Sequence, residues 1–251
     1  MVKILLTNDD GIGAEGLRTL AETLGKSFEV VVAAPDRERS AIGTAVTLRR
    51  SLKVRCDPPL TRDCVTYAIS GTPTDCVILA LGKMVPDVDL VISGINQGHN
   101  LGDDILISGT VAGALQGYLR GKPAIAVSVA NPEFFPGAAR IAARLAARIA
   151  DGSLPPEVFL NVNLPDLSLD KIKETRVTNL SSASHIDTVD ESIEDGQTAY
   201  RLLRRRTANH ASPGTDIWAV EHGQISISPL HTLLLGRVQP KLNDQQFADL
   251  I

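Results

Sequence analysis

The chain is poor in aromatic residues, cysteines and positive charge, and each shortage excludes a class of protein. Aromatic side chains make up 4% of its 251 residues, which argues against a surface that stacks bases or sugars. Its three cysteines are neither even in number nor spaced as a metal-binding pair, so a disulfide framework or a zinc site is not expected. A net charge of -4 gives no support for nucleic-acid binding.

Long apolar runs are also missing. The longest are far shorter than a membrane span, and no basic segment followed by an apolar leader opens the chain. We therefore expect a cytoplasmic protein that does not bind a membrane. The length allows a large core in one domain, with or without an appendage.

Short apolar runs alternate with amphipathic stretches in the first two thirds of the chain. Residues 4–6 and 29–34 predict buried strands on either side of a helix over 14–24, and this βαβ unit implies parallel strands. The fold class is therefore α/β: a Rossmann-like, mostly parallel sheet with helices on both faces. Further strands are expected at 86–93, 124–129 and 159–162, and further helices at 71–81, 111–118 and 135–150.

Two regions depart from this alternation. Residues 47–70 alternate in short runs, which predicts a β-hairpin inserted into the core. Beyond residue 165 we expect strands at 171–179 and 199–206 around a polar stretch from 185 to 196, and a last strand pair from 214–216 and 223–230. We predict a catalytic core over 1–165 and a β-rich C-terminal extension over 166–251 that packs on the core and on a partner subunit.

One helix carries a stripe of positive charge. Arg140, Arg144 and Arg148 recur every four residues in the helix predicted over 135–150. Like charges at this spacing lie on one face and are typical of contact with solvent.

Two adjacent carboxylates directly follow the first predicted strand. Asn8, Asp9 and Asp10 end the apolar run, and glycines come next. In an open parallel sheet, ligands bind beyond the carboxyl ends of the strands. Two crowded carboxylates repel each other unless a cation or a shared proton offsets the repulsion. A divalent metal is the simplest such cation.

A competing interpretation comes from the glycines of the same loop. Gly11, Gly13 and Gly16 have the spacing of a dinucleotide-binding fingerprint, and Asp36 follows about twenty residues later. Two acids directly before the loop would repel a pyrophosphate in the absence of a metal. An acidic turn in contact with solvent is the structural alternative.

Other polar residues are expected at the same edge of the sheet. Ser40 follows the second strand, and Asn96 lies in a loop over residues 94–104 that is rich in glycines and amides. A helix then begins at Ser108, and its free backbone amides and positive dipole end would suit a phosphate. The predicted phosphate- and substrate-binding residues are Asn8, Asn96, Gly98, Ser108, Gly109 and Thr110.

These residue types favour metal-assisted phosphoryl chemistry. The candidate metal ligands Asp9, Asp10, Ser40 and Asn96 are all oxygen donors, which selects magnesium, calcium or manganese over zinc. A metal with open positions beside a phosphate site would polarise a phosphoryl oxygen and lower the pKa of water. Hydrolysis of a phosphomonoester is the simplest reaction, with Asp9 and Asp10 as catalytic residues. Whether Asp10 is only a ligand or also a base stays open.

Several ordered motifs spread over nearly the whole chain resemble those of the survival protein SurE family. They are Thr7-Asn-Asp-Asp-Gly11, Ala34-Pro-Asp-Arg-x-x-Ser40, Gly71-Thr-Pro-Thr-Asp-Cys76, Ser93-Gly-Ile-Asn-x-Gly-x-Asn-x-Gly102, Ser108-Gly-Thr-Val111, Gly121-x-Pro-Ala-Ile-Ala-Val-Ser128, Gly214-Thr-Asp216 and Ile225-Ser-Ile-Ser-Pro-Leu230.

The resemblance implies a Rossmann-like, metal-dependent 5'-nucleotidase that releases phosphate from nucleoside monophosphates. Some family members also act on 3'-nucleotides or short polyphosphate. By position, the family's metal ligands fall on Asp9, Asp10, Ser40 and Asn96, which would hold one magnesium or manganese ion per subunit. The resemblance also implies a homodimer or homotetramer that exchanges the C-terminal extension. Many members have an aromatic residue where this chain has Ile107.

Two other functions remain compatible with the sequence. A non-catalytic nucleotide-binding module would use the loop from Gly11 to Gly16 and would bind nucleotide without metal. A metal-dependent transferase would use the same site but would need an acceptor in place of water. Nucleotide binding in the presence of a chelator separates the first of these from the phosphatase.

Overall fold

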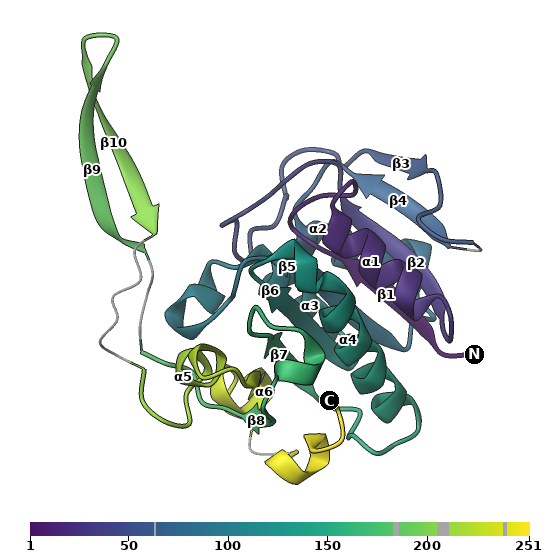
Figure 1. The fold of residues 1–251 in the computed structure, drawn as a ribbon. Helices are drawn as coiled ribbons and strands as arrows, with labels where there is room; N and C mark the ends of the chain where they lie inside the picture. Colours follow the sequence, from purple (N-terminus) through teal and green to yellow (C-terminus); the bar gives the residue numbers. More distant parts are fainter. Residues whose placement is uncertain (63, 183–185, 205–210, 238–239) are drawn as a thin grey trace.

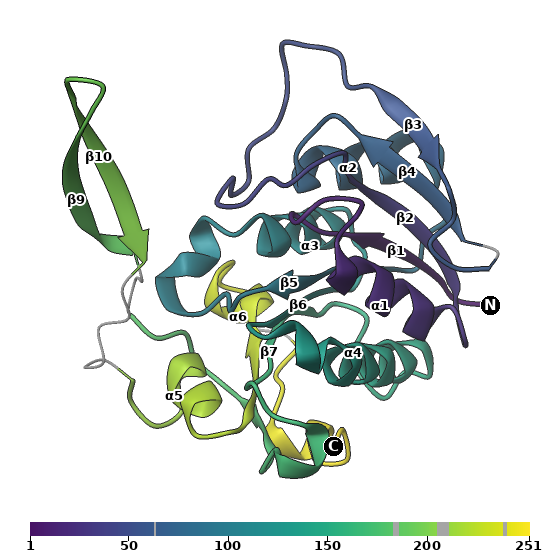
Figure 2. The same ribbon diagram turned by 45° about the horizontal axis from the view of Figure 1, so that its top comes forward.

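A nine-stranded sheet forms the centre of the computed structural model, which describes all residues except 63, 183–185, 205–210 and 238–239. The strand order is β3-β4-β2-β1-β5-β6-β7-β11-β8, with helices on both faces (Figures 1 and 2). The predicted α/β class is confirmed. The strands are β1 (Lys3–Thr7), β2 (Glu29–Pro35), β3 (Val54–Asp57), β4 (Val65–Ile69), β5 (Leu90–Gln97), β6 (Ala124–Val129), β7 (Phe159–Asn163), β8 (Thr175–Val177) and β11 (Ile225–Pro229).

Two pairs of helices cover the two faces of the sheet. Helices α1 (Glu15–Leu24) and α4 (Phe135–Ala150) pack on one face, and α2 (Pro73–Leu79) and α3 (Gly109–Leu119) pack on the other. Each interior strand therefore buries both faces: in β1, Ile4 and Leu6 join the core under α1 and α4, while Leu5 joins the core under α2. Burying one such side chain stabilises the fold by about 1.5–3 kcal/mol. Among the described helices, none has the length and apolar character to cross a membrane.

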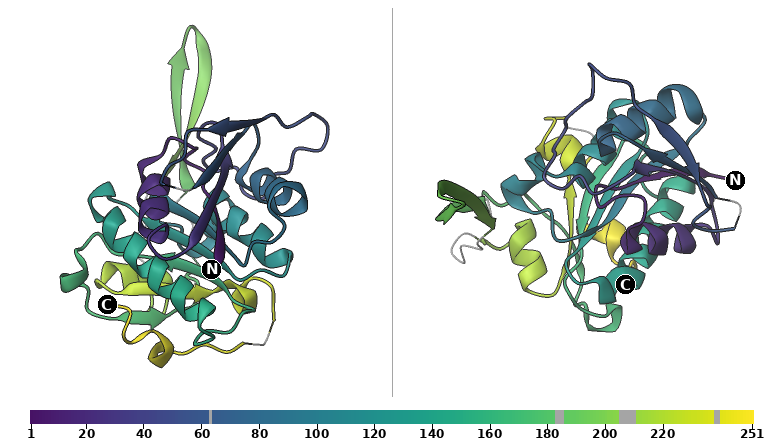
Figure 3. Two further views of the ribbon diagram at one scale, coloured as in Figure 1. Left: turned by 90° about the vertical axis from the view of Figure 1, so that its right-hand side faces the viewer. Right: turned by 90° about the horizontal axis from the view of Figure 1, so that it is seen from above.

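The parallel pairing brings three strand ends to one edge of the sheet. Strand β1 pairs with β2 on one side and with β5 on the other, and Leu6 lies opposite Val32 and Ile92. The segments that follow β1 and β2 and the end of β5 therefore meet on the same side of the molecule (Figure 3). This is the edge at which the sequence predicts the site.

The predicted inserted hairpin is present. Strands β3 and β4 pair antiparallel, and β4 extends the main sheet by pairing parallel with β2. Thr72 caps α2, because its hydroxyl accepts a hydrogen bond from the backbone of Asp75.

The C-terminal region contributes strands to the same sheet. Strand β11 pairs antiparallel with β7 and parallel with β8. The predicted strand pair of 214–216 with 223–230 is wrong, because the chain turns into helix α5 (Asp216–Glu221) directly after Thr215. The apolar run of β11 finds its partners in β7 and β8 instead.

A two-stranded hairpin projects from the body of the molecule (Figure 1). It consists of β9 (Ile186–Glu194) and β10 (Gln197–Arg204). The strand predicted over 199–206 corresponds to β10, but the polar stretch predicted over 185–196 contains strand β9 from residue 186 to 194. Residues 185, 205 and 206 lie outside the described residues. An exposed ribbon buries neither face completely, so β9 lacks the continuous apolar run that marks the core strands.

The arginine stripe of α4 holds the C-terminal segment. Arg144 donates to the carbonyl of Leu250, and Arg148 donates to the carbonyl of Gln246 and the carboxylate of Asp249. The prediction of a face turned wholly to solvent is therefore wrong for these two arginines. They fix the segment that inserts Phe247 and Leu250 into the core.

Asp75 binds the segment around Thr47 to the start of α2. Its carboxylate accepts hydrogen bonds from the backbone and hydroxyl of Thr47, at 2.8 and 2.6 Å, and from the backbone of Thr72 at 3.0 Å. Burial alone would raise the pKa of Asp75, but these hydrogen bonds outweigh burial and hold the pKa below the ordinary value of 3.8.

We expect Asp75→Asn to lower the free energy of unfolding at neutral pH by about 1–3 kcal/mol, because two backbone donors and a hydroxyl lose a charged acceptor. A lowered pKa stabilises the fold above the ordinary value, and this contribution is lost as the pH falls through the folded-state pKa. The gap between wild type and variant should therefore narrow below about pH 4. Urea unfolding of both proteins over a pH series measures this difference in the free energy of unfolding. Thr47→Val removes one donor and keeps the carboxylate, so it should lower the free energy of unfolding less than Asp75→Asn does. A difference between wild type and Asp75→Asn that does not change with pH would contradict this role of the charge.

Candidate functional site

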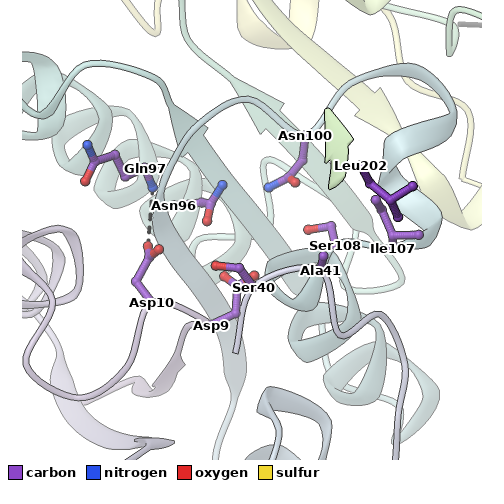
Figure 4. Close-up of a pocket in the computed structure, with 10 residues that line it drawn as sticks. All are labelled: Asp9, Asp10, Ser40, Ala41, Asn96, Gln97, Asn100, Ile107, Ser108 and Leu202. Carbon is purple, nitrogen blue, oxygen red and sulfur yellow. Dashed lines mark hydrogen bonds between the residues drawn. The ribbon is translucent and has the colours of Figure 1, made fainter. Parts of the chain in front are cut away.

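A cavity of about 440 Å³ opens at the carboxyl ends of β1, β2 and β5. Five predicted site residues line it, namely Asp9, Asp10, Ser40, Asn96 and Ser108, and Figure 4 shows them with their neighbours around one space. The volume is in the range of small-molecule sites. The four predicted metal ligands thus belong to one cavity, although Ser40 and Asn96 lie far from Asp9 in the sequence.

Asp9 lies against the amino end of α3. The hydroxyl of Thr110 donates to its Oδ1, and only a glycine fits opposite it. A Cβ at Gly109 would lie 2.7 Å from the Cβ and 2.9 Å from the Oδ2 of Asp9. Burial raises the pKa of Asp9, and hydrogen bonds from Thr110 and from the backbone amides of Gly109 and Thr110 oppose the rise. The predicted phosphate site and the acid pair are therefore in direct contact.

Asp10 is the more accessible carboxylate of the pair. Its Oδ2 accepts a hydrogen bond of 3.3 Å from the backbone of Gln97, the last residue of β5 (Figure 4). Burial and the charge of Asp9 raise the pKa of Asp10 to about 6. A divalent cation between the two carboxylates would relieve the repulsion that this pKa reflects.

The other two candidate ligands are held by near neighbours in the sequence. The hydroxyl of Ser40 donates to the carboxylate of Glu38 at 2.7 Å, and the Nδ2 of Asn96 donates to the carbonyl of Gly98 at 2.7 Å. Both interactions use a donor of the side chain, so its oxygen keeps the lone pairs that a cation needs. The donor set therefore fits a hard divalent cation that prefers oxygen.

The other four predicted site residues, Asn8, Gly98, Gly109 and Thr110, do not belong to the lining of this cavity. Asn8 is fully buried and donates to the carbonyl of Gly11 at 2.9 Å. The hydroxyl of Ser108 accepts from the backbone of Val111 at 3.1 Å, so Ser108 is also the cap of α3.

Sequence reasoning missed half of the cavity lining. Ala41, Gln97, Asn100, Ile107 and Leu202 were not predicted as site residues, yet they complete the wall. Asn100 belongs to the quoted glycine-rich motif, and that position could have pointed to it. Leu202 comes from the projecting strand β10, and no local pattern connects it with the site.

The glycine spacing of the first loop has a packing explanation. A Cβ at Gly16 would lie 2.1 Å from the carbonyl oxygen of Ile95, so the close approach of α1 to β5 requires glycine there. A Cβ at Gly13 would meet nothing within 4 Å. The spacing that resembles a dinucleotide fingerprint therefore reflects the packing of α1 on β5 at Gly16.

Asp216 ties the C-terminal region to the glycine-rich loop. Its buried carboxylate accepts hydrogen bonds from the backbone of Gly102 at 2.7 Å, of Ser181 at 2.8 Å and of Ile217 at 2.9 Å. Burial raises the pKa of Asp216, and these backbone donors oppose the rise. The Gly214-Thr215-Asp216 motif thus supplies the carboxylate that holds the glycine-rich loop over residues 94–104.

The fold and the cavity define the class of protein: a doubly wound α/β protein whose ligand site lies at the carboxyl ends of parallel strands. The family profile described as Survival protein SurE matches residues 4–187, more than half of the chain. The chain belongs to the survival protein SurE family.

Relatives and a solved structure agree with this assignment. A protein of Dehalococcoides mccartyi strain BAV1 named 5'-nucleotidase SurE is 49% identical, over 100% of this chain and 96% of its own length. A protein of the same name from Vibrio parahaemolyticus is 42% identical, over 91% and 88% of the two chains. The crystal structure of SurE protein from Aquifex aeolicus superposes with a TM-score of 0.78 at 38% identity and covers 91% of this chain and 93% of that chain.

Proposed function

We propose that this protein is a metal-dependent phosphatase that hydrolyses nucleoside 5'-monophosphates to nucleoside and phosphate. The observation that carries the proposal is the cavity that unites Asp9, Asp10, Ser40 and Asn96 at the amino end of α3. The relatives named 5'-nucleotidase support the nucleotide as substrate.

The four oxygen donors would hold one magnesium or manganese ion per subunit. When bound, such an ion polarises a phosphoryl oxygen and lowers the pKa of water. The adjacent carboxylates of Asp9 and Asp10 supply the negative charge that attracts it, and Ser40 and Asn96 supply neutral oxygens. Few protein ligands leave room for water and substrate.

The amino end of α3 is the proposed phosphate site. The positive end of its dipole favours an anion, and Ser108 lies there with its hydroxyl on the cavity wall. A second cavity of about 420 Å³ on the other side of Asp10 is lined by Glu15 and Glu38. These acids disfavour an anion, so the phosphate belongs on the Ser108 side.

Hydrolysis then follows from the placement of the residues. Water attacks the phosphorus, a new phosphorus–oxygen bond forms, and the bond to the ribose oxygen breaks. The nucleoside leaves with a proton that comes from the water. We assign to Asp10 the orientation of the attacking water, because Asp10 is the more accessible acid and borders both cavities.

The nucleoside would occupy the apolar end of the cavity. Ala41, Ile107 and Leu202 line this end, opposite Asp10 and Gln97 (Figure 4). 3'-Nucleotides and short polyphosphate present the same terminal phosphate, so we include them as further substrates.

A homodimer or homotetramer is the proposed assembly. Cross-strand pairing puts Val189, Ile193, Tyr200 and Leu202 on one face of the β9–β10 hairpin, and all four are exposed. An exposed apolar face of this kind is typical of a protein interface.

Phosphate release from a panel of nucleoside monophosphates, with manganese or magnesium and then with a chelator, tests the proposal. We expect release that depends on the metal and stops with the chelator. Nucleotide binding without metal and without turnover would favour the non-catalytic binding module. Transfer of phosphate only to an added alcohol would favour a transferase.

A further inference from the structure

Strand β7 carries two asparagines in the interior of the sheet. Asn161 and Asn163 are fully buried, and because they are two residues apart they share one face of the strand. The neighbours of Asn163 on the adjacent strands are also polar, since Ser128 of β6 and Ser226 of β11 lie opposite it. Buried amides destabilise a core unless they are hydrogen-bonded, so the partners of these side chains indicate their role.

Both asparagines bind the backbone of Asn100. Asn163 accepts from its N–H through Oδ1 at 2.9 Å and donates to its carbonyl through Nδ2 at 3.0 Å. Asn161 donates to the same carbonyl at 2.8 Å. The peptide groups of a residue in the glycine-rich loop are thus fixed by side chains from the core of the sheet.

The side chain of Asn100 is fixed as well. Its Nδ2 donates to the hydroxyl of Ser128 at 2.9 Å. The side chain lines the cavity, and Figure 4 shows it directed toward the space beside Asn96 and Ser108. This bond uses one N–H of the amide, so the second N–H and the carbonyl oxygen are left for the substrate or for water.

The loop needs this support because glycines flank Asn100. Gly98 has a φ of 127° and Gly102 a φ of 55°, both in the region that glycine occupies readily. Such residues also permit many other conformations. Without the contacts from β7, the peptide of Asn100 could rotate, and its amide would leave the cavity wall.

We propose that Asn163 is a positioning residue for the reaction, which acts by holding the Asn100 amide in the cavity, with Asn161 as a second support. The inference rests on the proposed phosphatase function. It assigns to two residues of the sheet core a role in turnover that their burial alone does not suggest. A displacement of about 1 Å in a reacting site can lower the rate about 100-fold.

Asn163→Ala should lower kcat roughly 10- to 100-fold, with a smaller change in KM. The test is a double-mutant cycle with Asn100→Ala. If Asn163 acts through the Asn100 side chain, Asn163→Ala should change kcat less than about 2-fold in the Asn100→Ala background, because no amide is left to misplace. The same loss of kcat in both backgrounds would overturn the inference.

Thr178→Val is the matched control for stability. The hydroxyl of Thr178 is buried and hydrogen-bonded to Ser226 and Ser228 at 2.8 and 2.9 Å, on the side of the network away from Asn100. We expect this variant to lower the Tm as Asn163→Ala does and to keep the wild-type kcat. An equal loss of kcat in the control would overturn the assignment of a specific role to Asn163.

Asn161→Ala provides a second variant if Asn163→Ala does not fold. It removes one of two donors to the Asn100 carbonyl, so we expect a smaller loss of kcat with the same dependence on Asn100. Wild-type kcat in folded Asn161→Ala would overturn the supporting role. An inactive wild-type protein would count against the phosphatase function itself, which distinguishes the two failures.

Discussion

Asp10→Asn should lower the turnover of nucleoside monophosphates by about 1000-fold or more in a folded protein. The amide keeps the shape of the side chain and removes one of the two charges that would attract the cation. The bound cation would contribute several kcal/mol of transition-state stabilisation. The variant should fold well, because neutralising Asp10 removes the burial of a charge and the repulsion from Asp9, the two largest causes that raise the pKa of Asp10 to about 6. Steady-state phosphate release and thermal unfolding measure the two effects.

Asp57→Asn supplies the matched control for this change. Asp57 lies on β3 and pairs with Arg55 on the surface of the hairpin. The same chemical change there should leave turnover within about 2-fold of wild type, because an exposed ion pair contributes little. Wild-type turnover by folded Asp10→Asn would contradict the proposed role of the acid pair.

Gly109→Ala should also abolish most of the activity, through a single added methyl group. The new Cβ would lie 2.7 Å from the Cβ of Asp9, so Asp9 and the start of α3 must separate. We expect turnover to fall about 100-fold or more and the free energy of unfolding to fall by about 1–3 kcal/mol, as for an overpacked core. The activity loss should be seen at temperatures where the variant is fully folded.

Gly82→Ala is the comparison for this substitution. A Cβ at Gly82 would meet no atom within 4 Å, and the residue lies in a helical turn after α2. Turnover and stability should stay close to those of wild type. Equal activity in the two variants would show that the contact between Gly109 and Asp9 is not needed.

The part of the site that follows strand ends could be predicted from the sequence. The end of an apolar strand is a local signal, and parallel pairing brings such ends together, so the sequence alone places Asp9, Asp10, Ser40 and Asn96 at one edge of the sheet. The core strands were found for the same reason, because burial on both faces leaves a continuous apolar run.

Features that depend on distant partners could not be predicted in this way. Arg144 and Arg148 have the spacing of a face in contact with solvent, and only the fold reveals the C-terminal segment that covers them. Asn161 and Asn163 interrupt an apolar strand without showing that Asn100 is their partner. The hairpin strand β9 has no core face, so its sequence carries no strand pattern.

A metal soak of crystals of the wild-type protein tests the central claim most directly. Crystals soaked with manganese should give one strong anomalous peak per subunit at this cavity, within bonding distance of oxygens from Asp9 and Asp10 and close to Ser40 and Asn96. The same soak of Asp10→Asn crystals should give a weaker peak or none. A peak at another place in a protein that shows metal-dependent turnover would contradict the proposed site.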